Sequence, residues 1–575
     1  MDYNIVTLLI EDHIFKVRKS LLCEYSDYFR AMFSGNYVEK EQKEISINVI
    51  DPVSMNIIIG YMELGLIELS EFPFSTVGDL AIAANFLQIT ELIKQIDYFL
   101  EEQLSLKNWL EIKDIAQNAS SAKLEQAAST YGLLSFKSMR PEFIPTIQKL
   151  FWYLSHPYLN TDSEYYVFKF GINWVEHFEK GADCLLIILC CLDISKLNTA
   201  ELKDIKFLIR HYVNSLTEKV VDCLYKLSTD YELSIAGITK NKLSLCELFS
   251  EKVYNEVLNF MKESVQRKLK FTPVVPMWSH NDAKPEISPN YLYTFTEDAG
   301  FQQWLEVAEK NLWGWNITSW GPTKIVVVCG EHGRGTGSFM KEVKIYDVLK
   351  KEWIRHGVQL PLRRHGAVTV LGDSLFIVGG VGGFRVVLDT AIVYNLKRRS
   401  FRKIALLPDA IQTPAICTHE NAVYAAGYKN VYKYEDLGDK DKWTTVLETD
   451  IRANCLVSFK GYIYMTQSYF CNLYRFQPNP NAVLEEICQF SNPPVAICNL
   501  GYRLLAFTCS SSGLLDDTTV EEYEDTDTHI AKVVATGSSD IVVNGVAGSC
   551  AVVLMTLPVT PEASAYHKRY ITMYG

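Results

Sequence analysis

The stretch Leu375-Phe-Ile-Val-Gly-Gly380 decides the fold of the second half of the chain, because similar stretches recur every 40 to 50 residues or so. Each is a short apolar run, and most end in glycine. The others are Ile325-Val-Val-Val-Cys-Gly330, Ala422-Val-Tyr-Ala-Ala-Gly427 and, more weakly, Tyr462-Ile-Tyr-Met465. Such a repeat predicts that each run forms one strand and that the same small unit of structure surrounds each strand.

Aromatic pairs follow three of the four runs at a similar distance and indicate two further strands. The pairs are Tyr346 with Trp353, Tyr394 with Phe401, and Tyr434 with Trp443. Leu360-Pro361 and Leu407-Pro408 then precede another apolar run, the first of which opens as Arg363-Arg364-His365-Gly366-Ala367-Val368. This completes four strands per unit, which is typical of a β-propeller blade.

The repeat also predicts how the ring closes. Five units are recognisable between about 317 and 535, and a sixth is split between the two ends of the region. Ser549 to Met555 supplies an apolar strand at the C-terminus, while Tyr293, Phe295 and Trp304 form an aromatic hairpin before the first unit. Joining these pieces would remove exposed sheet edges, so we expect six blades.

The first half of the chain has a different character. Residues 1–104 mix strand-like runs at 5–10 and 45–49 with helical patterns at 55–64 and 77–87, which indicates an α+β domain. From 105 to 271 apolar residues recur at helical spacing, as in Trp109, Ile112, Ile115 and Ala116 and in Tyr166, Phe170 and Trp174.

Four prolines between 272 and 290 stop any helix and predict a linker, so the propeller is expected at 291–575. The predicted fold class is therefore multidomain: an α+β domain, an all-α domain and an all-β propeller.

Composition excludes several functions. A net charge of -12 disfavours binding to nucleic acid, whose phosphates repel an acidic protein. The most apolar stretch, residues 184–192, is far shorter than the roughly 20 residues that cross a bilayer, so we expect a buried helix there and no membrane association. Fourteen cysteines without a compact framework favour reduced thiols. We therefore expect a cytoplasmic protein, with nuclear or cytoskeletal association left open.

Several motifs resemble one protein family. The central motif of BTB domains is resembled by Phe15-Lys-Val-Arg-Lys-Ser-Leu-Leu-Cys-Glu-Tyr-Ser-Asp-Tyr-Phe-Arg-Ala-Met-Phe33. The later helices of BTB domains are resembled by Ile59-Gly-Tyr-Met62 and Ala81-Ile-Ala-Ala-Asn-Phe-Leu-Gln88. Residues 105–271 are similar to a BACK domain, through Asn108-Trp-Leu110 and the segment from Leu154-Ser155 through Glu164, Phe168 and Trp174. The repeats, with Gly379-Gly380, resemble Kelch. The chain is thus similar to BTB-BACK-Kelch proteins.

This resemblance implies an adaptor of a cullin-3 ubiquitin ligase, in which the BTB domain binds the cullin and the propeller recruits a protein substrate. The family's cullin-contacting element corresponds to Tyr37, Val38 and Glu39. Tyr37 could fill an apolar groove while Glu39 offers a charge-assisted hydrogen bond. The plainer reading is a solvated helix end. A cytoskeletal or scaffolding protein that uses the propeller to bind actin is the alternative function, because one fold serves many functions.

Three departures from the family pattern bear on dimerisation. The first BTB strand is expected within a few residues of Met1, which leaves no room for the usual N-terminal extension. Asn4, or Ile5 if no gap is allowed, replaces the aspartate that usually opens this strand, and Arg18 replaces a histidine. Neither replacement reproduces the original hydrogen-bonding groups, so the homodimer is expected to be altered or absent. The pairs Cys329-Gly330 and Ala426-Gly427 lack the full Kelch glycine pair.

Two motifs outside these signatures were weighed as sites. Gly330-Glu-His-Gly-Arg-Gly-Thr-Gly337 has the glycines of a phosphate loop but no lysine-serine ending, so an inter-strand loop is expected, with His332 and Arg334 as candidates for a substrate-binding face. The acidic run at 516–527 is expected to be a solvated loop.

Neither a zinc-ligand spacing nor a nucleophile motif is present in the sequence. No catalytic residue, cofactor or metal is therefore expected.

Overall fold

A computed structural model describes residues 5–34, 44–212, 215–279, 289–438, 440–501, 503–511, 516–525, 529–536, 541–543, 551–554 and 572. The chain divides between Leu269 and Lys270 into two compact units. Each is described by itself.

The first unit begins with a small sheet flanked by helices. Its strands are β1 (Ile5–Ile10), β2 (His13–Arg18) and β3 (Glu44–Ser46), in the order β2-β1-β3, with β1 antiparallel to β2 and parallel to β3. The helices are α1 (Lys19–Tyr25), α2 (Asp27–Ser34), α3 (Pro52–Leu64), α4 (Phe74–Phe86) and α5 (Thr90–Glu102). Alternate residues of β1 are buried, so the sheet lays one face on the helices and leaves the other exposed.

The second predicted strand of this domain is shorter than the sequence suggests. Apolar residues run from Ile45 to Val49, but β3 ends at Ser46. Asp51 caps α3 by accepting a hydrogen bond from the backbone of Ser54 at 2.9 Å, and the chain must turn toward that cap. Ile47 and Ile50 are nevertheless buried.

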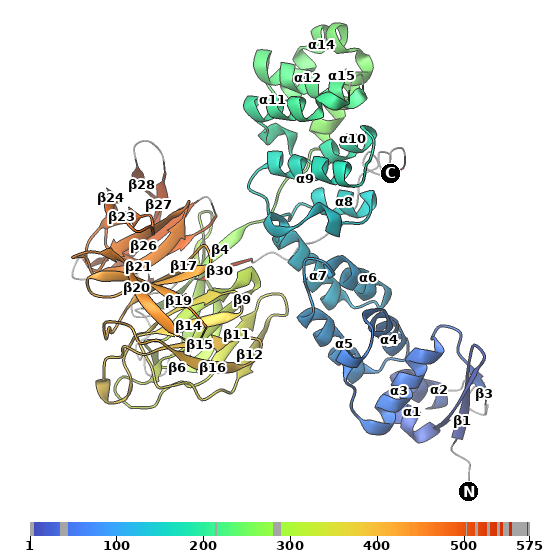
Figure 1. Ribbon diagram of the computed structural model, residues 1–575, viewed down its shortest axis with the longest axis horizontal. Helices are drawn as coiled ribbons and strands as arrows, with labels where there is room; N and C mark the ends of the chain where they lie inside the picture. Colours follow the sequence, from blue (N-terminus) through green and yellow to red (C-terminus); the bar gives the residue numbers. More distant parts are fainter. Residues whose placement is uncertain are drawn as a thin grey trace. The chain divides into compact units, whose positions relative to one another are not determined.

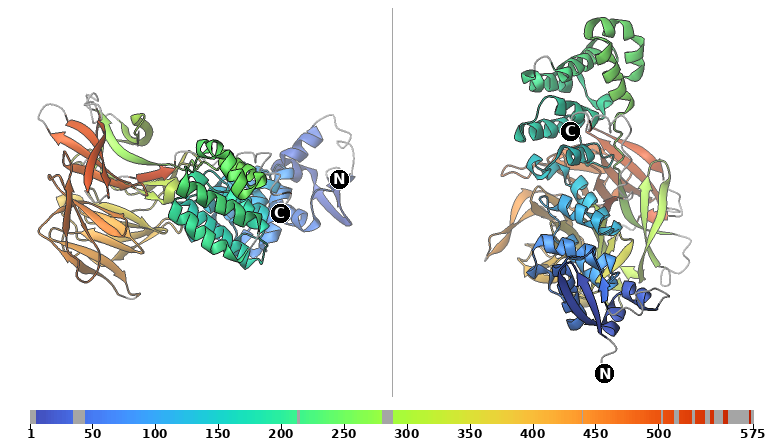
Figure 2. Two further views of the ribbon diagram at one scale, coloured as in Figure 1. Left: turned by 90° about the horizontal axis from the view of Figure 1, so that it is seen from above. Right: turned by 90° about the vertical axis from the view of Figure 1, so that its right-hand side faces the viewer.

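Ten helices fill the rest of the first unit among the described residues. They are α6 (Trp109–Asn118), α7 (Ala122–Leu134), α8 (Ile147–Leu154), α9 (Glu164–His177), α10 (Asp183–Cys190), α11 (Thr199–Leu208), α12 (Leu216–Asp230), α13 (Ile235–Lys240), α14 (Lys242–Phe249) and α15 (Glu251–Lys262). They stack in chain order away from the BTB-like sheet (Figures 1 and 2). The apolar run at 184–192 is buried throughout, as expected.

The stripe predicted on α9 is only partly correct. Phe170 and Trp174 are buried, but Tyr166 is 60% exposed. A spacing of four residues drifts by about 40° at each step along an α-helix, so Tyr166 points well away from Trp174.

A buried ion pair fastens the end of the helical region. Arg267 donates to both carboxylate oxygens of Glu164, at 2.8 and 2.9 Å, and to the backbone carbonyls of Leu154, His156 and Cys191. Glu164 also accepts from the backbone of Asp193 at 3.1 Å. The two side chains are 9% and 3% exposed. The segment after α15 is thereby tied to three earlier parts of the region.

The second unit is a β-propeller whose blades repeat four antiparallel strands. Blade 1 holds β8 (Asn316–Trp320), β9 (Lys324–Val328), β11 (Val343–Asp347) and β12 (Glu352–His356); blade 2, β13 (Ala367–Leu371), β14 (Ser374–Val378), β15 (Ala391–Asn395) and β16 (Ser400–Ile404); blade 3, β17 (Ala415–His419), β18 (Ala422–Ala426), β19 (Asn430–Asp436) and β20 (Asp441–Glu448). Blade 4 holds β21 (Ala453–Phe459), β22 (Tyr462–Gln467), β23 (Asn472–Phe476) and β24 (Glu485–Gln489); blade 5, β25 (Pro494–Asn499), β26 (Leu504–Ser511), β27 (Asp516–Glu524) and β28 (Ile530–Thr536).

The aromatic pairs seen in the sequence are direct cross-strand neighbours. Tyr346 lies opposite Trp353 and Tyr434 opposite Trp443, with ring centroids 5.2 Å apart in both cases. Tyr394 lies opposite Phe401 in the same way. Because such pairs stabilise the third and fourth strands of a blade, their recurrence marks the repeat.

Strands from the two ends of the region share blade 6, as the repeat predicts. Its sheet joins β4 (Phe271–Ser279), β5 (Pro289–Thr296) and β6 (Gly300–Lys310) to β29 (Ile541–Val543) and β30 (Ala551–Leu554), both of which pair with β4. The inner strands β8, β13, β17, β21, β25 and β30 contact one another in cyclic order, so the ring is closed. Apolar clusters lie between neighbouring blades.

The prediction of a linker over 272–290 is wrong for its first part. Residues 271–279 form β4, the strand that holds the two C-terminal strands. Pro273 and Pro276 stop a helix but do not prevent this strand, since proline only removes individual donors from the ladder. Val274, Val275 and Met277 are buried between the blades.

Candidate functional site

One end of the propeller gathers the long loops. All inner strands run in the same direction around the ring, so the loops that join the second strand to the third and the segments that enter each inner strand lie at the same end. We call this end the loop face; its described second-to-third loops are 329–342, 379–390, 427–429 and 468–471. Loops on a rigid scaffold are where recognition concentrates.

The loop face also carries most of the exposed apolar side chains of the propeller's loops. They are Leu362, Phe384, Val386, Val387, Leu406, Tyr428, Tyr469 and Phe470. The loops at the opposite end expose only Leu437 and Val483 among the described residues. This concentration makes the loop face the candidate protein-binding surface of the propeller.

The glycine-rich loop of blade 1 is folded around its own carboxylate. Glu331 is buried and accepts from the backbone N–H groups of Gly335, at 3.2 Å, and Gly337, at 2.7 Å. Arg364 from the segment entering blade 2 pairs with the same carboxylate. The amides that could hold a phosphate are therefore already occupied, and the segment is an inter-strand loop, as expected, with a two-residue strand β10 (Glu331–His332) paired to β7 (Leu312–Trp313).

The departure from the Kelch glycine pair has a structural cost. Gly379 and Gly380 of blade 2 have φ of 60° and 95°, and a Cβ on Gly380 would lie 2.7 Å from the carbonyl oxygen of Arg364. In blade 1 Cys329 holds the left-handed conformation, with φ of 65°. A side chain in this region is unfavourable, so blade 1 accepts strain that the second blade avoids.

The loop of blade 2 presents a fully exposed aromatic side chain. Phe384 and Arg385 have φ of 54° and 61°, which is the left-handed region for two consecutive non-glycine residues. Backbone hydrogen bonds from Gly382 to Val386 and from Val386 to Gly383 hold this tip, at 2.9 and 3.2 Å. Such strain persists only where the surrounding structure enforces it, and it clusters at functional sites.

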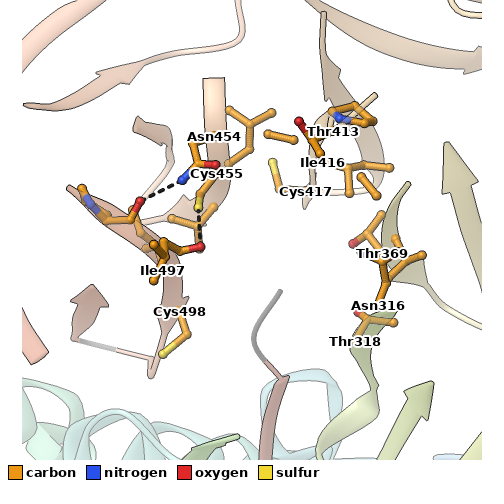
Figure 3. A pocket seen from close by; sticks show the side chains of 18 of the residues that line it. Asn316, Thr318, Thr369, Thr413, Ile416, Cys417, Asn454, Cys455, Ile497 and Cys498 are labelled. Carbon is orange, nitrogen blue, oxygen red and sulfur yellow. Dashed lines mark hydrogen bonds between the residues drawn. The ribbon is translucent and has the colours of Figure 1, made fainter. Parts of the chain in front are cut away.

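A cavity of about 1150 Å³ runs along the inner strands. Polar side chains link neighbouring strands around it. Asn454 donates to the carbonyl of Pro494 at 2.8 Å (Figure 3). Asn316 donates to the carbonyl of Gly366 at 2.9 Å. Cys417 also lines it, and burial raises the pKa of its thiol. At the loop face the mouth is lined by Arg452 and Tyr469, which is 92% exposed.

Only some of the site residues predicted from the sequence lie in the part of the chain that the structure describes. Tyr37, Val38 and Glu39 lie outside the described residues, between α2 and β3. His332 and Arg334 lie on the loop of blade 1, where the Arg334 guanidinium stands 5.8 Å from the centre of the Trp313 ring. Sequence reasoning missed Phe384 and Arg385, although a phenylalanine-arginine pair directly after the glycines of a Kelch repeat is a usable signal.

The acidic run at 516–527 is not a solvated loop where it is described. Residues 516–524 form β27, the third strand of blade 5, and Thr518, Val520 and Tyr523 are buried on it. Glu521 accepts from the backbone and hydroxyl of Ser491. Asp527 lies outside the described residues.

Over the part of the chain that is described, no cluster of histidine, cysteine and acidic residues is arranged to hold a metal. The thirteen described cysteines form no disulfide. None of the described helices is long and apolar enough to cross a membrane.

Comparison with known families agrees with this architecture. The BTB/POZ domain model matches residues 4–104, and the Kelch motif model matches residues 362–405, which span blade 2. A BTB domain followed by a propeller of Kelch repeats defines a class of interaction proteins. With a BTB/POZ domain and a Kelch motif in one chain, this protein is similar to the Kelch-like proteins of the BTB-Kelch class.

Individual relatives are distant. Human Kelch-like protein 15 is 30% identical over 178 residues, which are 30% of this chain and 29% of that protein. Human Kelch-like protein 28 is 32% identical over 175 residues, 30% of each chain. Kelch-like protein 26 of Danio rerio is 23% identical over 527 residues, 80% of this chain and 82% of that protein. The match to Kelch-like protein 15 thus spans less than a third of its length.

Proposed function

We propose that this protein is the substrate-recognition adaptor of a cullin-3 RING ubiquitin ligase and has no catalytic activity of its own. The BTB domain would bind the cullin, the helical region would extend that surface as a BACK domain does, and the loop face would bind the substrate. The observation that carries the proposal is the concentration of exposed apolar side chains on the loop face of a propeller that shares its chain with a BTB domain.

The proposed cullin contact is Tyr37-Val38-Glu39. Its position after the helix that ends the central BTB motif supports it, because α2 ends at Ser34. An aromatic anchor with an adjacent carboxylate is typical of a binding hot spot. Capture of the full chain by the purified cullin-3 amino-terminal domain should fall at least about tenfold in the Tyr37→Ala/Glu39→Ala variant, since losing an anchor side chain costs about 2 kcal/mol or more.

A matched control removes the same two side-chain types elsewhere. Tyr98 and Glu102 are exposed one helical turn apart on α5. The Tyr98→Ala/Glu102→Ala variant should bind cullin-3 as the wild type does. Equal capture of all three proteins would refute the contact, and no capture of any would refute the ligase role.

We propose further that the BTB homodimer is weak or absent. Ile5 and Arg18 lie directly opposite each other on β1 and β2, and both are exposed. An isoleucine facing an arginine cannot form the hydrogen-bonded pair that a carboxylate and an imidazole could form. Light scattering on the full chain should give the mass of a monomer at micromolar concentration; a stable dimer would contradict this.

The alternative function is that of an actin-binding or scaffolding protein, for which the exposed apolar side chains of the loop face would equally serve. Cosedimentation separates the two functions. A chain that pellets with actin filaments and is never captured by cullin-3 would replace the adaptor with this alternative.

A further inference from the structure

Two arginines on the loop face have no carboxylate within ion-pair distance among the described residues. Arg334 stands on the loop of blade 1 and Arg385 on the loop of blade 2. Arg385 reaches the loop that carries Arg334, because a Cβ at Gly335, the next residue, would lie only 3.8 Å from Nη2 of Arg385. Both side chains are exposed.

The local acidic residue cannot neutralise this pair. Glu331 points inward, where it accepts from Gly335 and Gly337 and pairs with Arg364. The carboxylate of Glu331 thus stabilises the conformation of its own loop, and the guanidinium groups of Arg334 and Arg385 remain exposed. In a chain of net charge -12, such a pair is a local exception.

An apolar ridge lies beside the arginines. Phe384 is fully exposed and directly precedes Arg385, and Val386 is 56% exposed. Leu362 from the segment that enters blade 2 approaches the base of this tip, since a Cβ at Gly383 would lie 3.6 Å from it. An arginine beside an exposed aromatic ring also occurs at the mouth of the cavity, where Arg452 lies 5.2 Å from the ring centre of Tyr428.

The backbone conformation supports a binding role for the ridge. An exposed side chain makes no contribution to the core, and glycine would hold φ of 54° without strain. Phe384 therefore gains nothing from burial in the folded protein, and its left-handed conformation is unfavourable.

We propose that the loops of blades 1 and 2 bind an acidic protein segment in which an apolar side chain lies next to a carboxylate. Arg334 and Arg385 would take the carboxylate through charge-assisted hydrogen bonds, and Phe384 with Val386 and Leu362 would take the apolar side chain. A short acidic segment carries fewer negative charges than a nucleic acid and therefore meets less repulsion from a chain of net charge -12. The inference rests on the proposed function only in that the loop face is the substrate face.

The test uses the full chain and fluorescence anisotropy with a labelled peptide of repeated Glu-Glu-Phe-Gly units. Peptides with glutamine in place of glutamate, or serine in place of phenylalanine, and a thymidine oligonucleotide serve as comparisons. The acidic aromatic peptide should bind tightest, and the Arg334→Ala/Arg385→Ala variant should weaken it about tenfold or more, the usual loss for a charge-assisted contact.

Two further variants sharpen the result. Arg355 and Arg398 are exposed arginines away from the loop face, so the Arg355→Ala/Arg398→Ala variant should bind normally. The Phe384→Gly variant should bind the acidic aromatic peptide several-fold more weakly, while its melting temperature is unchanged or higher. A purely structural Phe384 would instead lower the melting temperature.

Equal binding by the wild type and the Arg334→Ala/Arg385→Ala variant would overturn the inference, as would preference for the oligonucleotide or an equal loss in the control variant. Cullin-3 capture is measured on the same samples. If capture succeeds and peptide binding fails, only this inference falls; if the peptide binds and capture fails, only the adaptor function falls.

Discussion

At the scale of single residues, Arg267 shows how one side chain organises a region far from it in sequence. Its guanidinium offers five N–H donors, and all of them are used on Glu164 and three backbone carbonyls. A lysine could not replace it, because an ammonium has three donors and no planar fork. The value of the arginine lies in this geometry more than in its charge.

We expect Arg267→Ala to lower the free energy of unfolding of the helical region by about 3 to 5 kcal/mol, since removal of one partner leaves a buried charge uncompensated. Arg267→Lys should recover little of the loss. The control is Arg140→Ala, which breaks an exposed pair with Glu142 at 3.7 Å and should cost less than about 1 kcal/mol. Urea unfolding followed by far-ultraviolet circular dichroism measures both; equal losses would contradict the assignment.

At the scale of elements, the propeller depends on two short strands at its C-terminal end. β30 supplies the inner strand of blade 6 and contacts both β8 and β25. Ser319 on β8 donates to the carbonyl of Val552 at 3.0 Å and accepts from its N–H at 2.8 Å. The closure of the ring therefore combines apolar burial with a two-way hydrogen bond.

We expect a chain truncated after residue 540 to lose cooperative unfolding of the propeller. Without β29 and β30, β4 becomes an exposed edge and the buried residues of the neighbouring blades are uncovered. Limited proteolysis and thermal melting should show early loss of residues 270–536. The milder Ser319→Ala variant should stay folded and lose about 1 to 2 kcal/mol; a truncated chain as stable as the full one would contradict the closure.

At the scale of the whole molecule, each unit holds a histidine that resists protonation. Burial lowers the pKa of His156 to about 4, helped by Arg267 and Lys113. Burial also lowers the pKa of His356 to about 4, helped by Arg399, and its Nδ1 lies 2.8 Å from the hydroxyl of Tyr394. His156 Nδ1 accepts from the backbone of Tyr158 at 3.2 Å, which requires that nitrogen to be unprotonated.

We expect both units to lose stability as the pH falls from about 6.5 toward 4. An unfolded histidine has a pKa near 6.5, so in this window the unfolded chain binds more protons than the folded one and acid favours unfolding. The His156→Gln/His356→Gln variant should show a shallower decline between pH 7 and 5 in calorimetry. If stability falls with pH as steeply in the variant as in the wild type, groups other than these histidines cause the loss of stability in acid.

The sequence by itself determined the modules and the repeat. A tyrosine with a second aromatic residue, as in Tyr346 and Trp353, recurs in blades 1 to 3 because the two pack across the same two strands, so a local contact leaves a periodic trace. The burial of residues 184–192 was readable because every residue of that run is apolar, and the BTB domain was readable from its motif. Even the splitting of blade 6 followed from the apolar pattern at the two ends.

Only the tertiary structure decided how distant groups meet. The sequence did not predict β4, because Pro273 and Pro276 are typical of a linker. Only the pairing of β29 and β30 with this segment shows that it is a strand. The Arg267–Glu164 pair joins residues 103 positions apart, and Glu331 faces inward because Arg364 reaches it from the next blade. The exposure of Phe384 and the approach of Arg385 to the loop of Arg334 belong to the same class: they depend on backbone conformation and on contacts between blades, which leave no periodic signal in the sequence.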